Sequence, residues 1–157
     1  MDRRIDHYLR NLVDEDRFSF YGEVHRFASE SVAKDLLKWS REHVLLPDRV
    51  IREMGDMGLF GLTVEEEFGG QGGSQIDLVL AGLSLGYYSH SVAITPGAAT
   101  SLGTKPIQIF GSAQQKKAHL PDLAQGKRMF VFGLSEPGRG SDAANPEVTA
   151  VRDGDSW

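Results

Sequence analysis

Cysteine is absent from the 157-residue sequence, which excludes disulfide scaffolds, thiol catalysis and cysteine-ligated zinc or iron–sulfur sites. Long apolar runs are missing too: no segment approaches the roughly 20 apolar residues that a membrane-spanning helix needs. Basic residues are the minority, with 17 Lys and Arg against 22 Asp and Glu and a net charge of −5. We therefore expect no nucleic-acid partner, because a surface that follows phosphates needs an excess of positive charge.

The first residues also lack the pattern of a targeting signal. The range 1–7 contains basic residues with no apolar segment behind them, unlike a secretory signal, and its acidic residues are untypical of a transit peptide. A soluble cytoplasmic protein with no membrane span is the expectation.

Helical patterns occupy most of the chain. Apolar residues at helical spacing predict one helix over about 19–42, and a second is expected to begin near Pro47 and end near Gly58. The range 91–110 is apolar and rich in small residues, but Pro96 and Pro106 predict that its helix is interrupted.

Two N-cap signatures mark further helices. Ser74 followed by Asp77 predicts a helix that runs to about Tyr87, and Ser112 followed by Gln115 predicts a short helix that stops at Gly126. Both signatures place a hydroxyl and a side-chain acceptor three residues apart, where each can bond the other's backbone N–H.

A glycine-rich loop at 63–74 separates two of these helices. A phosphate-binding P-loop would need a lysine followed by Ser or Thr after a strand, and neither is present. We expect a flexible connector. The consecutive acids at 65–67 are expected to be solvated. The histidines show no metal-ligand spacing, and we expect surface or half-buried roles for them.

The character of the sequence changes near Met129. The ranges 129–135 and 147–152 are strand-like. The first runs through Ser135-Glu136 and breaks at Pro137-Gly138 into a loop with glycines, a serine and an aspartate. Backbone N–H groups and a hydroxyl in such a loop suit a flat, phosphate-bearing ligand, and a structural hairpin turn fits the same residues equally well.

Two narrower interpretations of this loop are less favoured. Residues 138–143 match the glycine spacing of a dinucleotide fingerprint, but no helix and no βαβ unit follow, so a doubly wound fold is not expected. Glu136 and Asp142 form a candidate carboxylate pair for catalysis. We prefer a turn-stabilising role for both, because short acidic side chains bond backbone donors in turns.

The residues from Phe132 to Asp142, FGLSEPGRGSD, resemble the signature of the acyl-CoA dehydrogenase family: an aromatic residue, any residue, Leu or Val, then Thr or Ser, Glu-Pro, two variable residues and Gly-Ser-Asp. Residues 54–70 and 111–126 are also similar to family segments, in family order and spacing. The resemblance covers about 19–157.

This resemblance implies a mainly α fold class, with an all-helical N-terminal domain followed by the first strands of an incomplete β-barrel domain. The expected division is a charged arm or short helix at 1–18, the helical domain at 19–126 and the start of the β domain at 127–157. Family members are much longer, so the resemblance implies a truncated chain without the C-terminal helical bundle.

The resemblance also implies a binding site for FAD. Phe132, Leu134 and Ser135 would lie along the flavin ring, and Gly140 and Ser141 would meet the pyrophosphate, with Ser141 also at the start of the acyl-CoA site. Four residues would border the acyl chain: Thr95, Ala98, Ala99 and Leu102. Arg139 departs from the family, which often has a small residue there, and would either touch phosphate or face water.

The implied reaction is α,β-desaturation of an acyl-CoA thioester with hydride transfer to FAD. The carboxylate base would come from the missing bundle, so no catalytic residue is assigned and the fragment is expected to be inactive alone. The implied acceptor is an electron-transfer flavoprotein or a similar protein, and the full-length protein is expected to be a homo-oligomer.

Two kinds of alternative remain open. One is a related flavoenzyme of the same superfamily, namely an acyl-CoA oxidase, a nitroalkane oxidase or a flavin monooxygenase. The other is a non-catalytic helical interaction module that binds no flavin.

Overall fold

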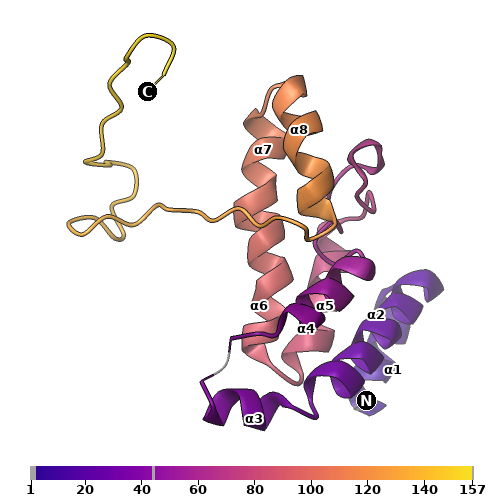
Figure 1. Cartoon of the computed structure of the whole chain (residues 1–157). Coiled ribbons are helices and arrows are strands. Elements are labelled where there is room, and N and C mark those ends of the chain that lie inside the picture. Colours follow the sequence, from indigo (N-terminus) through magenta and orange to yellow (C-terminus); the bar gives the residue numbers. More distant parts are fainter. Residues whose placement is uncertain (1–2, 44, 157) are drawn as a thin grey trace.

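The computed structural model describes residues 3–43 and 45–156 and is helical up to residue 124 (Figure 1). In chain order the elements are α1 (Arg3–Leu12), α2 (Glu15–Phe27), the π-helix η1 (Ala28–Val32), α3 (Leu36–Arg41), α4 (Asp48–Asp56), the 3₁₀-helix η2 (Glu66–Phe68), α5 (Gln75–Gly86), α6 (His90–Ala98), the π-helix η3 (Ala99–Thr104), α7 (Lys105–Phe110) and α8 (Ala113–Ala124). This confirms the mainly α fold class. Among these described helices, none has the length and apolar character needed to cross a membrane.

The helices pack around one long rod (Figure 1). The rod consists of α6, η3 and α7 in direct succession, and α8 folds back beside α7. Helix α5 packs against both α6 and α2, which places α1 and α2 on the other side of α5 from the rod.

The main hydrophobic core joins α2, α4, α5 and α6. Its largest fully buried side chains include Met54, Leu59, Phe60 and Leu85. A smaller cluster forms where α8 packs on the segment after α4, with Val64 and Leu120 buried at its centre. This second cluster fixes the end of the helical region from which the chain continues to residue 130.

The predicted helix over 19–42 is divided in the structure. It begins earlier, at α2, where the Asp14 carboxylate caps the helix by accepting from the N–H of Arg17. The chain then widens into η1, turns at 33–35 and resumes as α3. His25 on α2 is 5% exposed, so the expected surface or half-buried role is wrong for this histidine.

Both N-cap signatures form as predicted. The Ser74 hydroxyl accepts from the N–H of Ile76, and the Asp77 carboxylate accepts from the N–H of Ser74 at 2.6 Å. At α8 the Gln115 side chain accepts from the N–H of Ser112 at 2.8 Å. These boxes fix where α5 and α8 begin.

The glycine-rich loop is tied to its surroundings rather than free. The N–H groups of Gln71, Gly72 and Gly73 donate to the carbonyls of Gly61, Val64 and Leu62 at 2.9, 2.8 and 2.8 Å. The expected flexible connector is therefore an ordered loop, held by hydrogen bonds to the segment that follows α4.

The predicted interruption of the 91–110 helix is a wide turn rather than a break. Pro96 lies inside α6, and Pro106 lies in the first turn of α7. Between them the η3 segment changes to i→i+5 bonding, and the N–H of Lys105 donates to the carbonyl of Thr100. The rod therefore continues through the proline-containing stretch.

A buried glutamine connects this rod to the loop after α4. The Gln108 amide donates to the Thr63 carbonyl at 2.9 Å and to the Glu65 carboxylate at 2.8 Å. The bond from Gln108 holds the pKa of Glu65 below its usual range, against the opposing effect of burial. The angular position of Gln108 on the rod thus matters for the packing of the loop.

The two strand-like ranges form no sheet within the described residues. Ranges 129–135 and 147–152 pair with no other strand among residues 3–43 and 45–156. Just beyond them lie two isolated bridges, Glu136 with Arg139 and Asp153 with Ser156. A strand is stable only beside a neighbour that satisfies its N–H and C=O groups. No described segment forms a backbone ladder with these ranges, so the predicted strands are not realised here.

Candidate functional site

The segment that carries the candidate site leaves the helical region at Phe130. Its ring packs against the cluster around α8 and lies 5.4 Å from the ring of His119. Its carbonyl oxygen lies so close to Gly103 of η3 that a Cβ on this glycine would be 2.9 Å away. The absence of a side chain at Gly103 therefore lets the chain cross the rod at this point.

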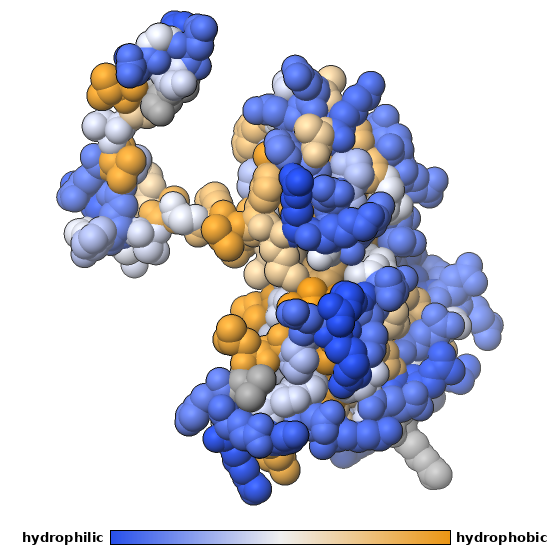
Figure 2. Space-filling model, viewed as in Figure 1, coloured by the Kyte–Doolittle hydropathy of each residue, from blue (hydrophilic) through white to orange (hydrophobic). Residues whose placement is uncertain are grey.

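Beyond Phe130 the segment stands clear of the helices. Figure 1 shows it crossing the rod and extending away, and Figure 2 shows a single file of residues outside the packed body. Val131 is 92% exposed, and the predicted flavin-side residues Phe132 and Leu134 are 52% and 46% exposed. These apolar side chains are thus available for contact with another group.

A tight turn follows at the Pro137-Gly138 pair of the motif. Glu136 and Arg139 exchange two backbone hydrogen bonds of 3.0 Å, which places Pro137 and Gly138 at the two central positions. A Cβ on Gly138 would lie 3.3 Å from the carboxylate oxygens of Glu147. Proline sets the bend, and glycine allows the later segment to approach it.

The Glu136 carboxylate closes this turn against the chain that follows. It accepts from the N–H of Glu147 at 2.7 Å and from the N–H of Val148 at 3.0 Å. The carboxylate therefore satisfies two backbone donors and stabilises the loop, the kind of role that the sequence predicted. Its partners lie further along the chain than a local turn would place them.

Asp142 is also used within the loop. It accepts from the Arg139 guanidinium at 2.6 Å and from the Asn145 amide at 2.7 Å. Arg139 donates in addition to the Glu147 carboxylate at 3.1 Å. These side chains join the two arms of the loop by ion pairs between exposed or half-exposed groups.

The predicted ligand-binding residues are the ones that this network leaves open. Ser135, Gly140 and Ser141 are exposed, and the hydroxyls of the two serines make no hydrogen bond within the described part of the chain. The N–H groups of Gly140 and Ser141 are likewise unbonded there. A Cβ at Gly140 would meet nothing within 4 Å, so a ligand can reach the backbone from that side.

The residues predicted to border an acyl chain lie on the rod close to this segment. Leu102 is 50% exposed and directly precedes Gly103, the crossing point of Phe130. Thr95 and Ala98 are half-buried.

The fourth residue of this group, Ala99, packs against the main core. The structure therefore brings Leu102 near the departing segment and turns Ala99 toward the protein interior.

The donor set suits a flat ligand that carries phosphate. Unbonded N–H groups and hydroxyls can hold phosphate oxygens without a cationic side chain, and the exposed Phe132 and Leu134 offer an apolar surface to a ring. Among the described residues there is no cluster of three His, Asp or Glu side chains that could hold a metal ion.

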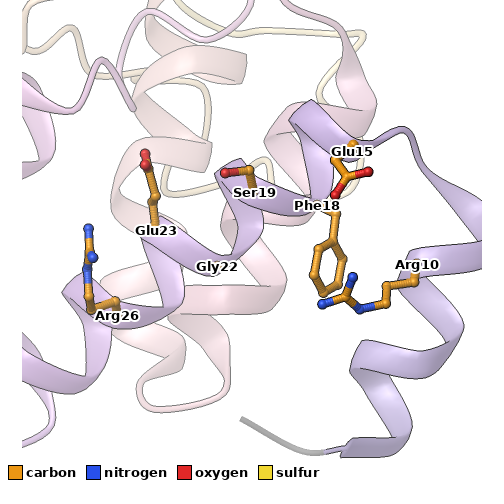
Figure 3. Close-up of a pocket in the computed structure, with 7 residues that line it drawn as sticks. All are labelled: Arg10, Glu15, Phe18, Ser19, Gly22, Glu23 and Arg26. Carbon is orange, nitrogen blue, oxygen red and sulfur yellow. The ribbon is translucent and has the colours of Figure 1, made fainter.

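A separate hollow lies between α1 and α2, on a different part of the molecule (Figure 3). It has a volume of about 450 Å³ and is lined by residues of both signs. The Arg10 guanidinium lies over the Phe18 ring at 4.2 Å from its centre. Glu15, Glu23 and Arg26 point outward from α2, so the hollow is an open, charged groove with no convergent set of donors.

The sequence indicated the loop but not how it is held. The bonds from Glu147 and Val148 to Glu136 join residues 11 and 12 positions apart. The ion pair of Arg139 with Asp142 had a local signal, opposite charges three positions apart. The contact of Phe130 with Gly103 had none.

The comparisons with known proteins agree with this architecture. Residues 14–127 match the family model of the acyl-CoA dehydrogenase N-terminal domain. The chain is 35% identical to (2S)-methylsuccinyl-CoA dehydrogenase of Cereibacter sphaeroides over 92% of the chain and 26% of that protein. It is also 35% identical to the mitochondrial short-chain specific acyl-CoA dehydrogenase of Mus musculus, over 83% of the chain and 32% of that protein.

A solved structure shows the same fold. Glutaryl-CoA dehydrogenase from Mycobacterium smegmatis, in complex with FADH2, superposes with a TM-score of 0.85 and 29% identity over 92% of the chain. The match covers 37% of the glutaryl-CoA dehydrogenase chain. The chain thus spans about a quarter to two fifths of the length of the proteins that it matches.

Proposed function

The chain belongs to the acyl-CoA dehydrogenase family, and on that basis we propose that it forms the N-terminal part of an FAD-dependent acyl-CoA dehydrogenase. The proposed reaction is α,β-desaturation of an acyl-CoA thioester. The family match at 14–127 lies in the helical region, and the loop that follows this region carries the donors that the proposal needs.

The observation that supports this proposal most directly is the set of unused donors in the 135–142 loop. Ser135, Gly140 and Ser141 present hydroxyls and N–H groups that have no partner within the described part of the chain. Carboxylates that would repel a phosphate are engaged elsewhere: Glu136 binds two backbone N–H groups, and Asp142 binds Arg139. The loop is thus arranged to accept an anionic, ring-bearing ligand.

Each residue then has a role in holding the cofactor and the substrate. Phe132 and Leu134 would lie against the flavin ring, and the Ser135 hydroxyl would donate to its polar edge. The N–H groups of Gly140 and Ser141 would hold the pyrophosphate, with Ser141 also at the entrance of the acyl-CoA site. When bound, FAD supplies the hydride acceptor, and hydrogen bonds at its ring raise its electron affinity.

The acyl chain would lie along the rod. Thr95, Ala98 and Leu102 would form its wall, and Ala99 would keep the rod close to the core because its small side chain packs there. We assign no carboxylate of this chain as the base that removes the α-proton. We place that base in a further part of the protein, so the 157-residue chain alone is proposed to be inactive.

The remaining assignments follow from the family. The proposed electron acceptor is an electron-transfer flavoprotein or a similar protein, the complete protein is proposed to be a homo-oligomer, and its proposed location is the cytoplasm.

The test is to express the complete reading frame that contains this chain and to add an acyl-CoA under anaerobic conditions. We expect a yellow protein whose flavin absorbance is bleached by the thioester, because substrate desaturation reduces the flavin. Rapid turnover with oxygen would instead indicate an oxidase or a monooxygenase. A colourless protein that binds no acyl-CoA would contradict the proposal and favour an interaction module.

A further inference from the structure

The loop after residue 135 keeps its shape without packing against the helices. Backbone bonds join Glu136 to Arg139, and the Glu136 carboxylate bonds the N–H groups of Glu147 and Val148. The side chain of Arg139 then joins both arms. The residues from 136 to 148 thus form a closed network that we call the clasp.

Arg139 makes the side-chain connections of the clasp. Its Nη1 atom lies 2.6 Å from the Asp142 carboxylate and its Nε atom lies 3.1 Å from the Glu147 carboxylate. The pair with Asp142 spans Gly140 and Ser141, the two residues whose donors remain open. Any change in this ion pair therefore acts directly on the conformation of these two residues.

Two carboxylates surround this guanidinium, so its charge is already balanced within the clasp. Together with Glu136 the clasp contains three acidic groups and one basic group. A phosphate would have to compete with both carboxylates for the guanidinium. The open N–H groups of Gly140 and Ser141 involve no such competition.

We propose that Arg139 is a positioning residue: it pairs with Asp142 and Glu147, holds Gly140 and Ser141 in their donor-presenting conformation, and makes no contact with phosphate itself. This inference rests on the proposed function. An arginine is needed because its planar fork reaches two carboxylates at once, whereas lysine offers a single point charge.

Two substitutions distinguish this role from direct phosphate binding. Arg139→Ala weakens binding in either case. Glu147→Gln has opposite effects in the two cases: in the clasp it removes the negative charge of the ion pair with Arg139 and weakens binding, whereas a phosphate-binding Arg139 would be freed from a competing carboxylate and would bind the ligand as well or more tightly. Because the two exposed pairs act on one conformation, we expect each variant to raise the dissociation constant by about two- to fivefold.

The experiment uses the protein from the complete reading frame, with FAD affinity of the apoprotein and the KM for acyl-CoA as readouts. We expect Arg139→Ala and Glu147→Gln to weaken binding similarly, and the double variant to be no weaker than either single one, because both break the same network. Arg139→Lys is expected to restore binding only in part. Arg152→Ala is the matched control, since within the described ranges the Arg152 side chain bonds only the Gly154 carbonyl.

A second readout needs no ligand. In the 157-residue chain, Arg139→Ala is expected to speed amide hydrogen exchange at residues 140–148 while exchange in α5 stays unchanged.

Unchanged exchange in this range, or Glu147→Gln binding at least as tightly as wild type, would overturn the inference. A wild-type protein without affinity for FAD or acyl-CoA would instead overturn the proposed function, because the exchange result does not depend on a ligand.

Discussion

The Tyr88 hydroxyl lies 3.0 Å from Nε2 of His25 in the partly buried joint between α2 and the end of α5. Aromatic rings surround the imidazole, with the Tyr21 and Tyr87 ring centres at 5.9 and 5.3 Å. Burial lowers the pKa of His25, and the Asp6 carboxylate opposes this effect. The folded state therefore favours the neutral form of this histidine more than the unfolded chain does.

We predict that this joint makes stability depend on pH. The unfolded histidine has its ordinary pKa of 6.5, above the folded value. Its contribution to stability is therefore fully present above pH 6.5 and is lost as the pH falls toward the folded pKa, because the unfolded chain binds the proton first. Urea unfolding across this range measures the effect.

The matched variants are His25→Gln and Tyr88→Phe. His25→Gln should lower the free energy of unfolding by about 1 kcal/mol at pH 7.5. This difference from wild type should shrink as the pH falls below 6.5. Tyr88→Phe keeps the ring and the burial, so the fall with pH should persist. Parallel curves for wild type and His25→Gln would contradict the prediction.

We predict that Asp77→Asn destabilises the chain by about 1–2 kcal/mol. Asp77 accepts from the N–H and hydroxyl of Ser74 and from Nε of Arg17 at 2.9 Å, so it joins the start of α5 to α2. Burial opposes its ionisation, but these partners outweigh burial and hold the pKa of Asp77 below 3.8. Its stabilisation is present above that pH and is lost as pH falls through the folded pKa.

Urea unfolding at neutral pH compares Asp77→Asn with Asp122→Asn. The Asp122 pair with Arg128 is more exposed and lies 3.3 Å apart, so its loss should cost less than about 0.5 kcal/mol. Equal effects of the two variants would show that the connection from α5 to α2 contributes nothing measurable.

We predict opposite effects for alanine at two glycines. Gly126 has φ of 67°, and a Cβ there would contact the ring of the buried Phe60. Gly126→Ala should therefore destabilise by about 2–4 kcal/mol. Gly22 lies inside α2 with nothing within 4 Å of a Cβ, so Gly22→Ala should stabilise by about 0.5–1 kcal/mol. Thermal unfolding measures both stability changes. If both variants shifted the melting temperature in the same direction, the prediction would be wrong.

We predict that Phe130→Ala releases the segment that leads to the candidate site. The half-buried ring packs beside Ile107 and His119, so its loss should cost about 1–3 kcal/mol. Limited proteolysis should then cut faster within 127–135. Val131→Ala removes a 92% exposed side chain and should change neither stability nor cleavage. Equal cleavage of both variants would show that Phe130 does not anchor the segment.

Features with a short-range cause could be predicted from the sequence. The caps at Ser74 and Ser112 formed because each hydroxyl and its partner lie three residues apart. The stop at Gly126 was predicted because glycine readily adopts the left-handed conformation found there. The candidate loop was found because its residues form one continuous motif.

Features that depend on distant partners could not be predicted. The contact of Phe130 with Gly103 and the bond from Arg17 to Asp77 leave no pattern in the sequence. The strand-like pattern at 129–135 is genuine, but strand formation also needs a neighbouring strand, and the pattern cannot supply one. The π-helix η3 escaped prediction because helical periodicity assumes 3.6 residues per turn.

The wide turn η3 also determines how the rod would respond to the deletion of one residue. An i→i+5 turn encloses one residue more than an α-helical turn, so deleting one residue from Ala99–Thr104 would leave an ordinary helix. The parts of the rod before and after the deletion would keep nearly the same relative orientation, because five residues of the wide turn cover about the same arc as four residues at about 100° each. Gln108 would therefore still face Thr63 and Glu65. A homologue one residue shorter at η3 would thus keep both its helix content and the attachment of its glycine loop, whereas a deletion in α6 would rotate Gln108 by about 100°.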